Sequence, residues 1–212
     1  MAADSYLHPL LKIPSDAFDV LFPSQKLPVL DFCDFRLPPS APRPKGKIDL
    51  STFFSDNPTV LTNLATIQAT PSPDSDTLDS LIEHIKTLFK NIPTDFDHRP
   101  AYYSILPVHL QHGIRHPLPL WVLTYWTELR TLRKDREMWI DGVNALRHME
   151  TAWKEDKKQQ VIAEIFTTLG ILPWGTTIAG FSNPEPMSVL ARYLGERWLS
   201  DAHGHHALDL LR

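Results

Sequence analysis

Residues 118–148 read LPLWVLTYWTELRTLRKDREMWIDGVNALRH, and this stretch decides the fold. No proline occurs between residues 120 and 172. Because proline interrupts helix interiors, its absence and the three- and four-residue spacing of apolar side chains predict a long helix here. A helix over the whole stretch would be about 45 Å long at 1.5 Å per residue, so we expect Gly142 to kink or interrupt it. The apolar stripe, broken only by Arg136, comprises Leu118, Val122, Tyr125, Leu129, Leu132, Trp139, Val143 and Leu146.

Further helical patterns lie on both sides of this stretch. Residues 76–91 carry apolar side chains at steps of three and four after a polar cluster, which is typical of an amphipathic helix. Residues 154–169 repeat the pattern and end at Gly170, for which we expect a left-handed helix cap. This helix should pair with the preceding one as an antiparallel hairpin. Shorter helices are predicted at 58–68, capped by Asp56 or Asn57, and at 184–194, after an extended piece at 176–181.

Proline marks out the N-terminal region. Residues 37–47 read LPPSAPRPKGK and predict an extended, polyproline-like, solvated segment. The arm also carries apolar residues such as Phe18 and Phe32, too many for a free linker, so we expect parts of it to lie on the folded body, with full disorder as the alternative. The sequence therefore predicts a mainly α protein: a proline-rich, partly extended arm at 1–57, a helical bundle-like body at 58–199, and a last helix at 200–212.

Composition excludes several classes of protein. The 212 residues are 42% hydrophobic and 10% aromatic, which excludes a wholly disordered chain. Cys33 is the only cysteine, so no intrachain disulfide can form, and no secretory signal is visible, which favours an intracellular, nuclear or cytoplasmic location. The longest mostly apolar run, residues 118–126, is far shorter than the roughly 20 residues that span a bilayer. The net charge of −4 carries no nucleic-acid signature by itself.

Candidate catalytic and metal sites are weak. His203 and His206 lie one helical turn apart near Asp201 and Asp209, but surface histidines explain them better than a metal site does. The same holds for the histidines at 109, 112 and 116, whose helix Gly113 and Pro117 would break. Cys33 lacks a nearby histidine base, and Asp31 and Asp34 should raise the pKa of its thiol. No glycine-rich phosphate loop is present. We therefore predict no catalytic residue, no metal and no cofactor.

Four cations lie within two helical turns of the long helix. Arg130, Arg133, Lys134 and Arg136 are candidates for contacts with nucleic-acid phosphates. Acidic residues at 128, 135 and 137 alternate with them, which favours a solvated mixed-charge face instead. Tryptophans at 121, 126, 139 and 153 are interpreted as core residues rather than as a ligand platform.

The end of the chain carries a resemblance. Residues 193–201 read YLGERWLSD, followed by LDLL at 208–211. This resembles the opening of the ubiquitin-like-protein-specific (SUMO) cysteine protease domain, which begins with a Trp-Leu-Asn/Ser-Asp turn feeding an amphipathic helix. Together with LPLWVLTYWTELRTLR from Leu118 and ILPWGTTIAGFSNPEP from Ile171, it looks like fungal, transposon-associated proteins that carry such a domain. The resemblance covers roughly residues 105–212.

The resemblance implies a role in protein contact. Trp198 would anchor the turn, and Asp201 would cap the helix or pair with a basic residue of a ubiquitin-like substrate. In this cysteine peptidase family the catalytic histidine, aspartate and cysteine follow the opening helix, so they are not in this chain, which is a fragment, a shortened gene product or a stand-alone relative. The leading hypothesis is a non-catalytic accessory region that contacts a ubiquitin-like protein or a downstream protease domain. The alternatives are a nucleic-acid-binding helper of a mobile element and, with least support, a thiol enzyme using Cys33.

Overall fold

The computed structural model describes residues 9–43, 49–57, 63–90, 104–107, 117–178 and 185–195. Backbone contacts divide the chain into two compact units. Unit 1 comprises Met1–Phe22 and Leu37–Thr131, and unit 2 comprises Pro23–Arg36 and Leu132–Arg212. The division falls inside the longest helix, α5 (Val122–Ala152). Both units draw on residues 1–57, where the sequence predicts a separate arm, and the predicted last helix at 200–212 lies outside the described residues.

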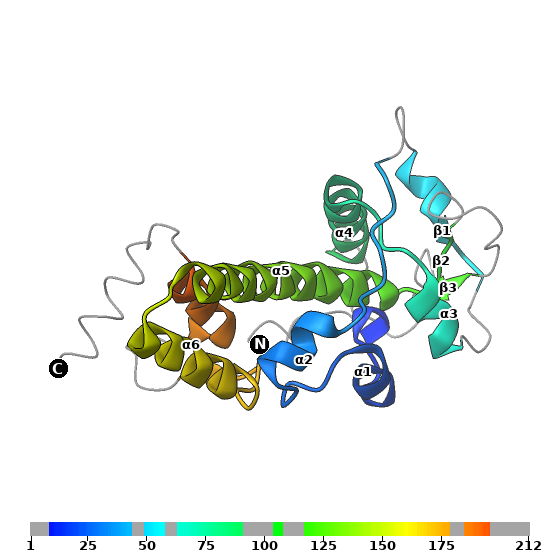
Figure 1. The fold of residues 1–212 in the computed structure, drawn as a ribbon. Coiled ribbons are helices and arrows are strands. Elements are labelled where there is room, and N and C mark those ends of the chain that lie inside the picture. The colour runs from blue at the N-terminus through cyan, green and yellow to red at the C-terminus, as the bar shows by residue number, and fades with distance from the viewer. Residues whose placement is uncertain are drawn as a thin grey trace. The chain divides into compact units, whose positions relative to one another are not determined.

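The fold is mainly α-helical, as predicted (Figure 1). Two-residue strands form the described sheets, and each described sheet is antiparallel. In unit 1, β2 (Ser104–Ile105) lies between β1 (Phe54–Ser55) and β3 (Leu118–Pro119), with Ile105 opposite Phe54 on one side and Leu118 on the other. The described elements of unit 1 outside α5 are η2 (Pro9–Leu11), α1 (Ser15–Leu21), η3 (Leu50–Phe53), β1 (Phe54–Ser55), α3 (Leu64–Ala69), α4 (Ser75–Lys90), β2 (Ser104–Ile105) and β3 (Leu118–Pro119).

Helix α4 confirms the helix predicted at 76–91. Asp74 precedes it, and its carboxylate accepts hydrogen bonds from the backbone N–H of Thr77 at 3.3 Å and from the Thr77 hydroxyl at 2.6 Å. These contacts satisfy a backbone donor that the first turn leaves without a partner. Leu81 and Ile85 are almost completely buried in unit 1. The apolar stripe of α4 is therefore a core face.

The short helix predicted at 58–68 begins later than expected. Helix α3 starts at Leu64, and its N-cap is Asn63, whose side chain accepts a hydrogen bond from the Ala65 N–H at 2.9 Å. The prediction of Asp56 or Asn57 as the cap is wrong, because Asn63 offers the same capping chemistry directly before the described helix. Residues 58–62 lie outside the described part of the chain.

The N-terminal arm is partly helical and partly extended. Helices α1 and α2 (Val29–Asp34) form in it, and Phe32 is fully buried, which confirms that apolar residues of the arm lie on the folded body. The stretch from 37 to 43 forms no helix, and Ser40 pairs with Ser72 in a parallel β-bridge, as expected of an extended segment. Within unit 1, Ala41 N–H donates to the Ser72 carbonyl at 2.7 Å, and Ser72 N–H donates to the Pro39 carbonyl at 3.2 Å. Ala41 is buried, so the prediction of a wholly solvated segment is wrong at this position.

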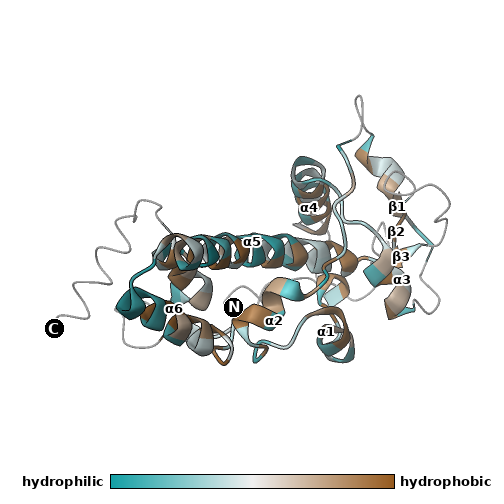
Figure 2. Cartoon of the chain, in the orientation of Figure 1, coloured by the Kyte–Doolittle hydropathy of each residue, from teal (hydrophilic) through white to brown (hydrophobic). Residues whose placement is uncertain are grey.

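Unit 2 is built on the C-terminal part of α5. The helix continues through Gly142, so the predicted interruption is wrong, while a kink at this glycine stays a prediction. Figure 2 shows mostly hydrophilic residues at the start of α6, which carries its buried residues, Ile162 and Leu169, further along. The other described elements of unit 2 are α2, α6 (Asp156–Leu169), β4 (Thr177–Ile178), β5 (Glu185–Pro186) and η4 (Met187–Leu194).

Two helix ends in unit 2 differ from the predictions. Gly170 ends α6 with φ −71° and ψ −11°, which is right-handed, so the left-handed cap is wrong. The extended piece at 176–181 is confirmed at β4, which pairs with β5. Glu185 belongs to β5 rather than to the first turn of a helix. The helix that follows begins at Met187 and has 3-10 geometry.

Candidate interaction site

The two residues that the resemblance assigns to substrate contact, Trp198 and Asp201, lie outside the described residues. So do the histidines weighed as metal ligands, at positions 109, 112, 116, 203 and 206. Within the described ranges, no group of three or more histidine, cysteine, aspartate or glutamate side chains is placed to hold a metal ion.

Arg130, the first of the four clustered cations, is paired within unit 1. Its Nη1 lies 2.8 Å from the Asp79 Oδ1 on α4. Both side chains are partly exposed, at 36% and 60%, so the pair is worth about 0–1 kcal/mol. The contact fastens the start of α5 to α4 and partly neutralises the guanidinium.

Arg136, which breaks the apolar stripe, serves a structural purpose in unit 2. Its Nε donates to the Phe32 carbonyl at 3.3 Å, and its Nη2 donates to the Cys33 carbonyl at 2.5 Å. Both carbonyls belong to the last turn of α2, where backbone acceptors lack partners within the helix. A cation is also favourable at a helix C-terminus. The charge at this position of α5 therefore caps α2.

The other two cations differ in exposure. Lys134 is exposed, and Arg133 is half-buried. Arg130 is held by a carboxylate, and Arg136 is held by two carbonyls. The assignment of the four cations to nucleic acid stays a prediction.

The Cys33 thiol lies half-buried on α2. The pKa of the Cys33 thiol is raised to about 11, mainly by burial, with Asp34 also raising it and Arg136 and Arg147 lowering it. The direction agrees with the sequence-based expectation, but burial rather than neighbouring acids is the main cause. Because the thiolate is the nucleophilic form, a thiol with this pKa is almost entirely protonated and unreactive at neutral pH.

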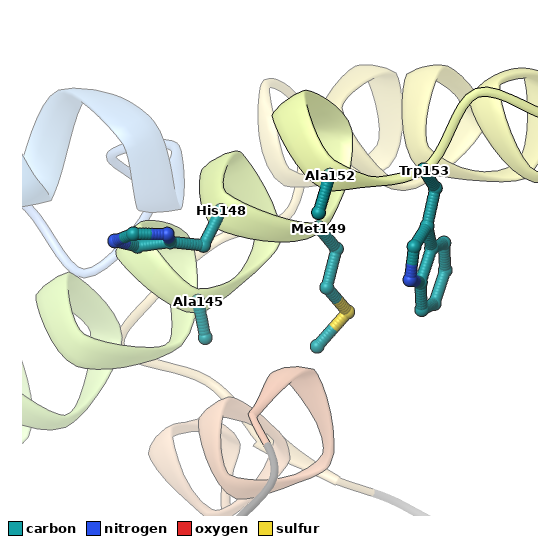
Figure 3. Close-up of a pocket in the computed structure, with 5 residues that line it drawn as sticks. All are labelled: Ala145, His148, Met149, Ala152 and Trp153. Atoms are coloured by element: carbon teal, nitrogen blue, oxygen red, sulfur yellow. The ribbon is translucent and has the colours of Figure 1, made fainter.

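A groove of about 380 Å³ lies along the last turns of α5 in unit 2. It is lined by Ala145, His148, Met149, Ala152 and Trp153. In Figure 3, Ala145, Met149 and Trp153 point toward the side of α5 on which η4 lies, whereas the His148 ring points away from them. The Lys158 ammonium lies 5.4 Å from the centroid of the Trp153 ring. The groove thus combines apolar side chains with a comparable share of polar surface, and the Lys158 charge lies near Trp153.

The prediction that the tryptophans are core residues holds for Trp126 and Trp139, which are fully buried, but not for Trp153, which is 39% exposed. Trp153 follows directly after the end of α5, in the turn that leads to α6. There the Gln159 amide donates hydrogen bonds to the carbonyls of Glu150 and Trp153. The turn fixes the backbone of Trp153 while its ring remains at the surface.

Unit 2 exposes other large apolar side chains. Ile171 is 76% exposed, Val161 is 53% exposed and Tyr193 is 42% exposed. Scattered apolar residues are common on protein surfaces, but large exposed apolar side chains that gather in a patch are typical of contact sites. Val161 and Ile162 are neighbours in the same predicted helix. The sequence pattern does not show that Val161 is exposed and Ile162 is buried.

Comparison with known proteins identifies no relative. No family model matches the chain, and neither a curated protein nor a solved structure does. Within the described residues, no helix combines the length and the apolar character needed to cross a membrane.

Proposed function

We propose that this chain is a non-catalytic interaction region that holds a SUMO-protease-like domain or its ubiquitin-like substrate through protein contacts. The observation that carries the proposal is the exposure of large apolar side chains on unit 2, above all Ile171 and Val161. Exposed apolar residues that become buried in a complex provide much of its binding free energy.

The protonated state of Cys33 supports the non-catalytic part of the proposal. A cysteine peptidase needs a thiolate, whose pKa is lowered by a neighbouring histidine or by a helix N-terminus. The pKa of Cys33 is raised to about 11 instead, and Cys33 lies in the last turn of α2, whose carbonyls bind Arg136. This environment favours a structural thiol.

The identity of the partner rests on the resemblance of residues 193–201 and 208–211 to the opening of the SUMO protease domain. On this proposal Trp198 and Asp201 belong to the contact with that domain or its substrate. An intracellular location, nuclear or cytoplasmic, and an origin in a fungal, transposon-associated protein belong to the same proposal.

Binding measurements with the full chain test this function. We would titrate it with SUMO and, separately, with the catalytic domain of a SUMO-specific protease. We expect one of them to bind and Ile171→Asp to weaken that binding about tenfold or more, as expected for a residue at the centre of an interface. Val20→Asp is the matched control, because Val20 is 54% exposed but belongs to unit 1. Absence of binding to both proteins, or equal effects of the two substitutions, would contradict the proposal.

A nucleic-acid-binding helper is the second candidate, favoured by the exposure of Lys134 beside Arg133 on α5. Phosphate contacts make the logarithm of the affinity fall linearly with the logarithm of the salt concentration. Binding at low salt with this dependence, weakened by Lys134→Gln, would support the candidate. The absence of binding at low salt would remove it.

A further inference from the structure

Helix η4 lies along α5 in unit 2 and runs in the same direction. Near its start, the Ser188 hydroxyl donates to the Asp135 carboxylate at 3.0 Å. At its end, Leu194 and Ala191 lie against Gly142. A Cβ added at Gly142 would be 2.7 Å from the Ala191 carbonyl oxygen and 3.3 Å from the Leu194 Cβ. The contact therefore moves from Asp135 to Gly142 on α5 as the chain moves from Ser188 to Leu194.

The groove continues this line of contact along α5. Ala145, Met149 and Ala152 follow Gly142 at intervals of three, four and three residues, which places them on one face of the helix. All three line the groove. Within the described part of the chain, the groove therefore lies on the continuation of the α5 face that η4 contacts, and Ala145, Met149 and Ala152 are its apolar part.

We propose that this groove binds residues 196–212 of the same chain, with Trp198 or Leu199 against Met149. Met149 lies about 10 Å beyond Gly142 along α5 at 1.5 Å per residue. Helix η4 ends at Leu194, and Gly195 is extended, with φ −114° and ψ 172°. An extended chain spans at most about 3.3–3.6 Å per residue, so Trp198 and Leu199 are within reach of Met149.

The composition of this segment fits the groove. Apolar side chains occur at its beginning and again near its end: Trp198, Leu199, Leu208, Leu210 and Leu211. Seventeen residues, 196–212, cover the length of the groove even in a helical conformation, which would extend about 25 Å.

Covalent connection favours this segment over a second copy of the chain. The described chain reaches Gly195 one residue after Leu194, which already contacts α5. A tethered segment this close to its site experiences an effective concentration of roughly millimolar, which a separate molecule does not reach at micromolar concentration.

This inference rests on the proposed function in one respect: the groove would be where the interaction region holds the start of the protease-like domain. The contact itself is a property of this chain alone and has its own test. Loss of SUMO or protease binding in the titration above would contradict the proposed function and leave the groove contact standing.

Disulfide trapping in the full chain tests the contact. In a Cys33→Ser background, we would combine Leu199→Cys with Met149→Cys, and compare this pair with Leu199→Cys combined with Glu150→Cys. Glu150 is exposed and lies one residue, and so about 100° of helix rotation, away from Met149. Far-UV circular dichroism checks folding, and Ala152→Cys serves as a second groove position if Met149→Cys fails to fold.

We expect the Met149 pair to form an intramolecular disulfide about tenfold or more faster than the Glu150 pair, because both pairs share the same tether and differ only in the face of α5. Mass spectrometry of proteolysed samples identifies the bond. Rates within about threefold of each other would overturn the proposal. So would a Met149 disulfide that joins two chains and forms in proportion to protein concentration, since a second copy would then occupy the groove.

Discussion

Replacing Arg136 by methionine tests whether this residue of α5 caps α2. Methionine keeps much of the length and apolar stem of arginine but cannot donate a hydrogen bond. The substitution leaves the Cys33 carbonyl without its 2.5 Å partner. The Phe32 carbonyl loses a longer bond of 3.3 Å and keeps its contact with the Phe35 N–H at 3.2 Å.

The magnitude follows from these two contacts. A hydrogen bond from a charged donor contributes about 1.5–3 kcal/mol, and the short bond to Cys33 accounts for most of the effect. The long bond adds little because its acceptor keeps another donor. We therefore expect Arg136→Met to lower the free energy of unfolding by about 2 kcal/mol.

Urea denaturation of the full chain, followed by far-UV circular dichroism, measures this change. Lys134→Met is the control, because Lys134 is exposed on the same helix and its loss should change stability by less than about 0.5 kcal/mol. Equal effects of the two substitutions would refute the capping role. If Arg136→Met instead left stability unchanged and abolished binding of nucleic acid, the arginine would be a phosphate ligand.

Three further predictions concern unit 2. Gly142→Ala should lower the free energy of unfolding by about 1 kcal/mol or more in urea denaturation, because overpacking against the Ala191 carbonyl outweighs the higher helix propensity of alanine. The control Gly170→Ala should be neutral or stabilising, because the added Cβ meets its nearest atom only at 3.4 Å. A stabilising effect of Gly142→Ala would contradict the close packing of η4. The Cys33 thiol should react with iodoacetamide at pH 8 about 100-fold more slowly in the native chain than in urea, since its pKa is about 11 rather than 9.0; equal rates would contradict its burial. Burial raises the pKa of the Asp135 carboxyl, so the folded state binds this proton more tightly than the unfolded state does. Protonation of Asp135 therefore stabilises the folded state fully below the ordinary pKa of 3.8, and this stabilisation is lost as the pH rises through the raised pKa. Asp135→Asn should therefore stabilise the chain at pH 7 by more than at pH 3.5, and an equal effect at both pH values would refute this.

The long helices follow from sequence because their information is local. Helix α4 shows a cap residue, an apolar stripe and no internal proline, and these determine its position within a residue at each end. Helix α5 was predicted for the same reasons. The sequence does not predict that α5 continues through Gly142. The reason for a glycine at this position is the close approach of η4, which lies about 50 residues further along the chain.

The short helices α1 and α2 could not be predicted because distant residues stabilise them. Helices α1 and α2 have 7 and 6 residues, and helices this short are marginal in isolation. Helix α2 is held by Arg136 and by a stacking contact, 4.0 Å between ring centroids, of Phe32 with Trp174. Nothing near Val29 in the sequence indicates these partners.

The groove illustrates a similar limit at the candidate site. Residue type favours burial of Trp153, and the helix predicted from the sequence ends at residue 148. The sequence therefore does not predict a groove along residues 145–153. The extension of α5 to Ala152 positions Trp153 in the following turn and exposes its ring. The interruption of the apolar stripe at Arg136 was visible in the sequence, but its role as a cap requires knowing where α2 ends.

A covalent activity probe tests most directly whether this chain contacts other proteins without cleaving them. SUMO carrying a vinyl sulfone at its C-terminus reacts with the catalytic cysteine of a SUMO protease, and the full chain would be incubated with it at pH 7.5 beside an active protease. Because the raised pKa keeps Cys33 protonated, we expect no covalent adduct on this chain. An adduct that forms on Cys33 and disappears with Cys33→Ser would show that the thiol is a working nucleophile and would contradict the non-catalytic role.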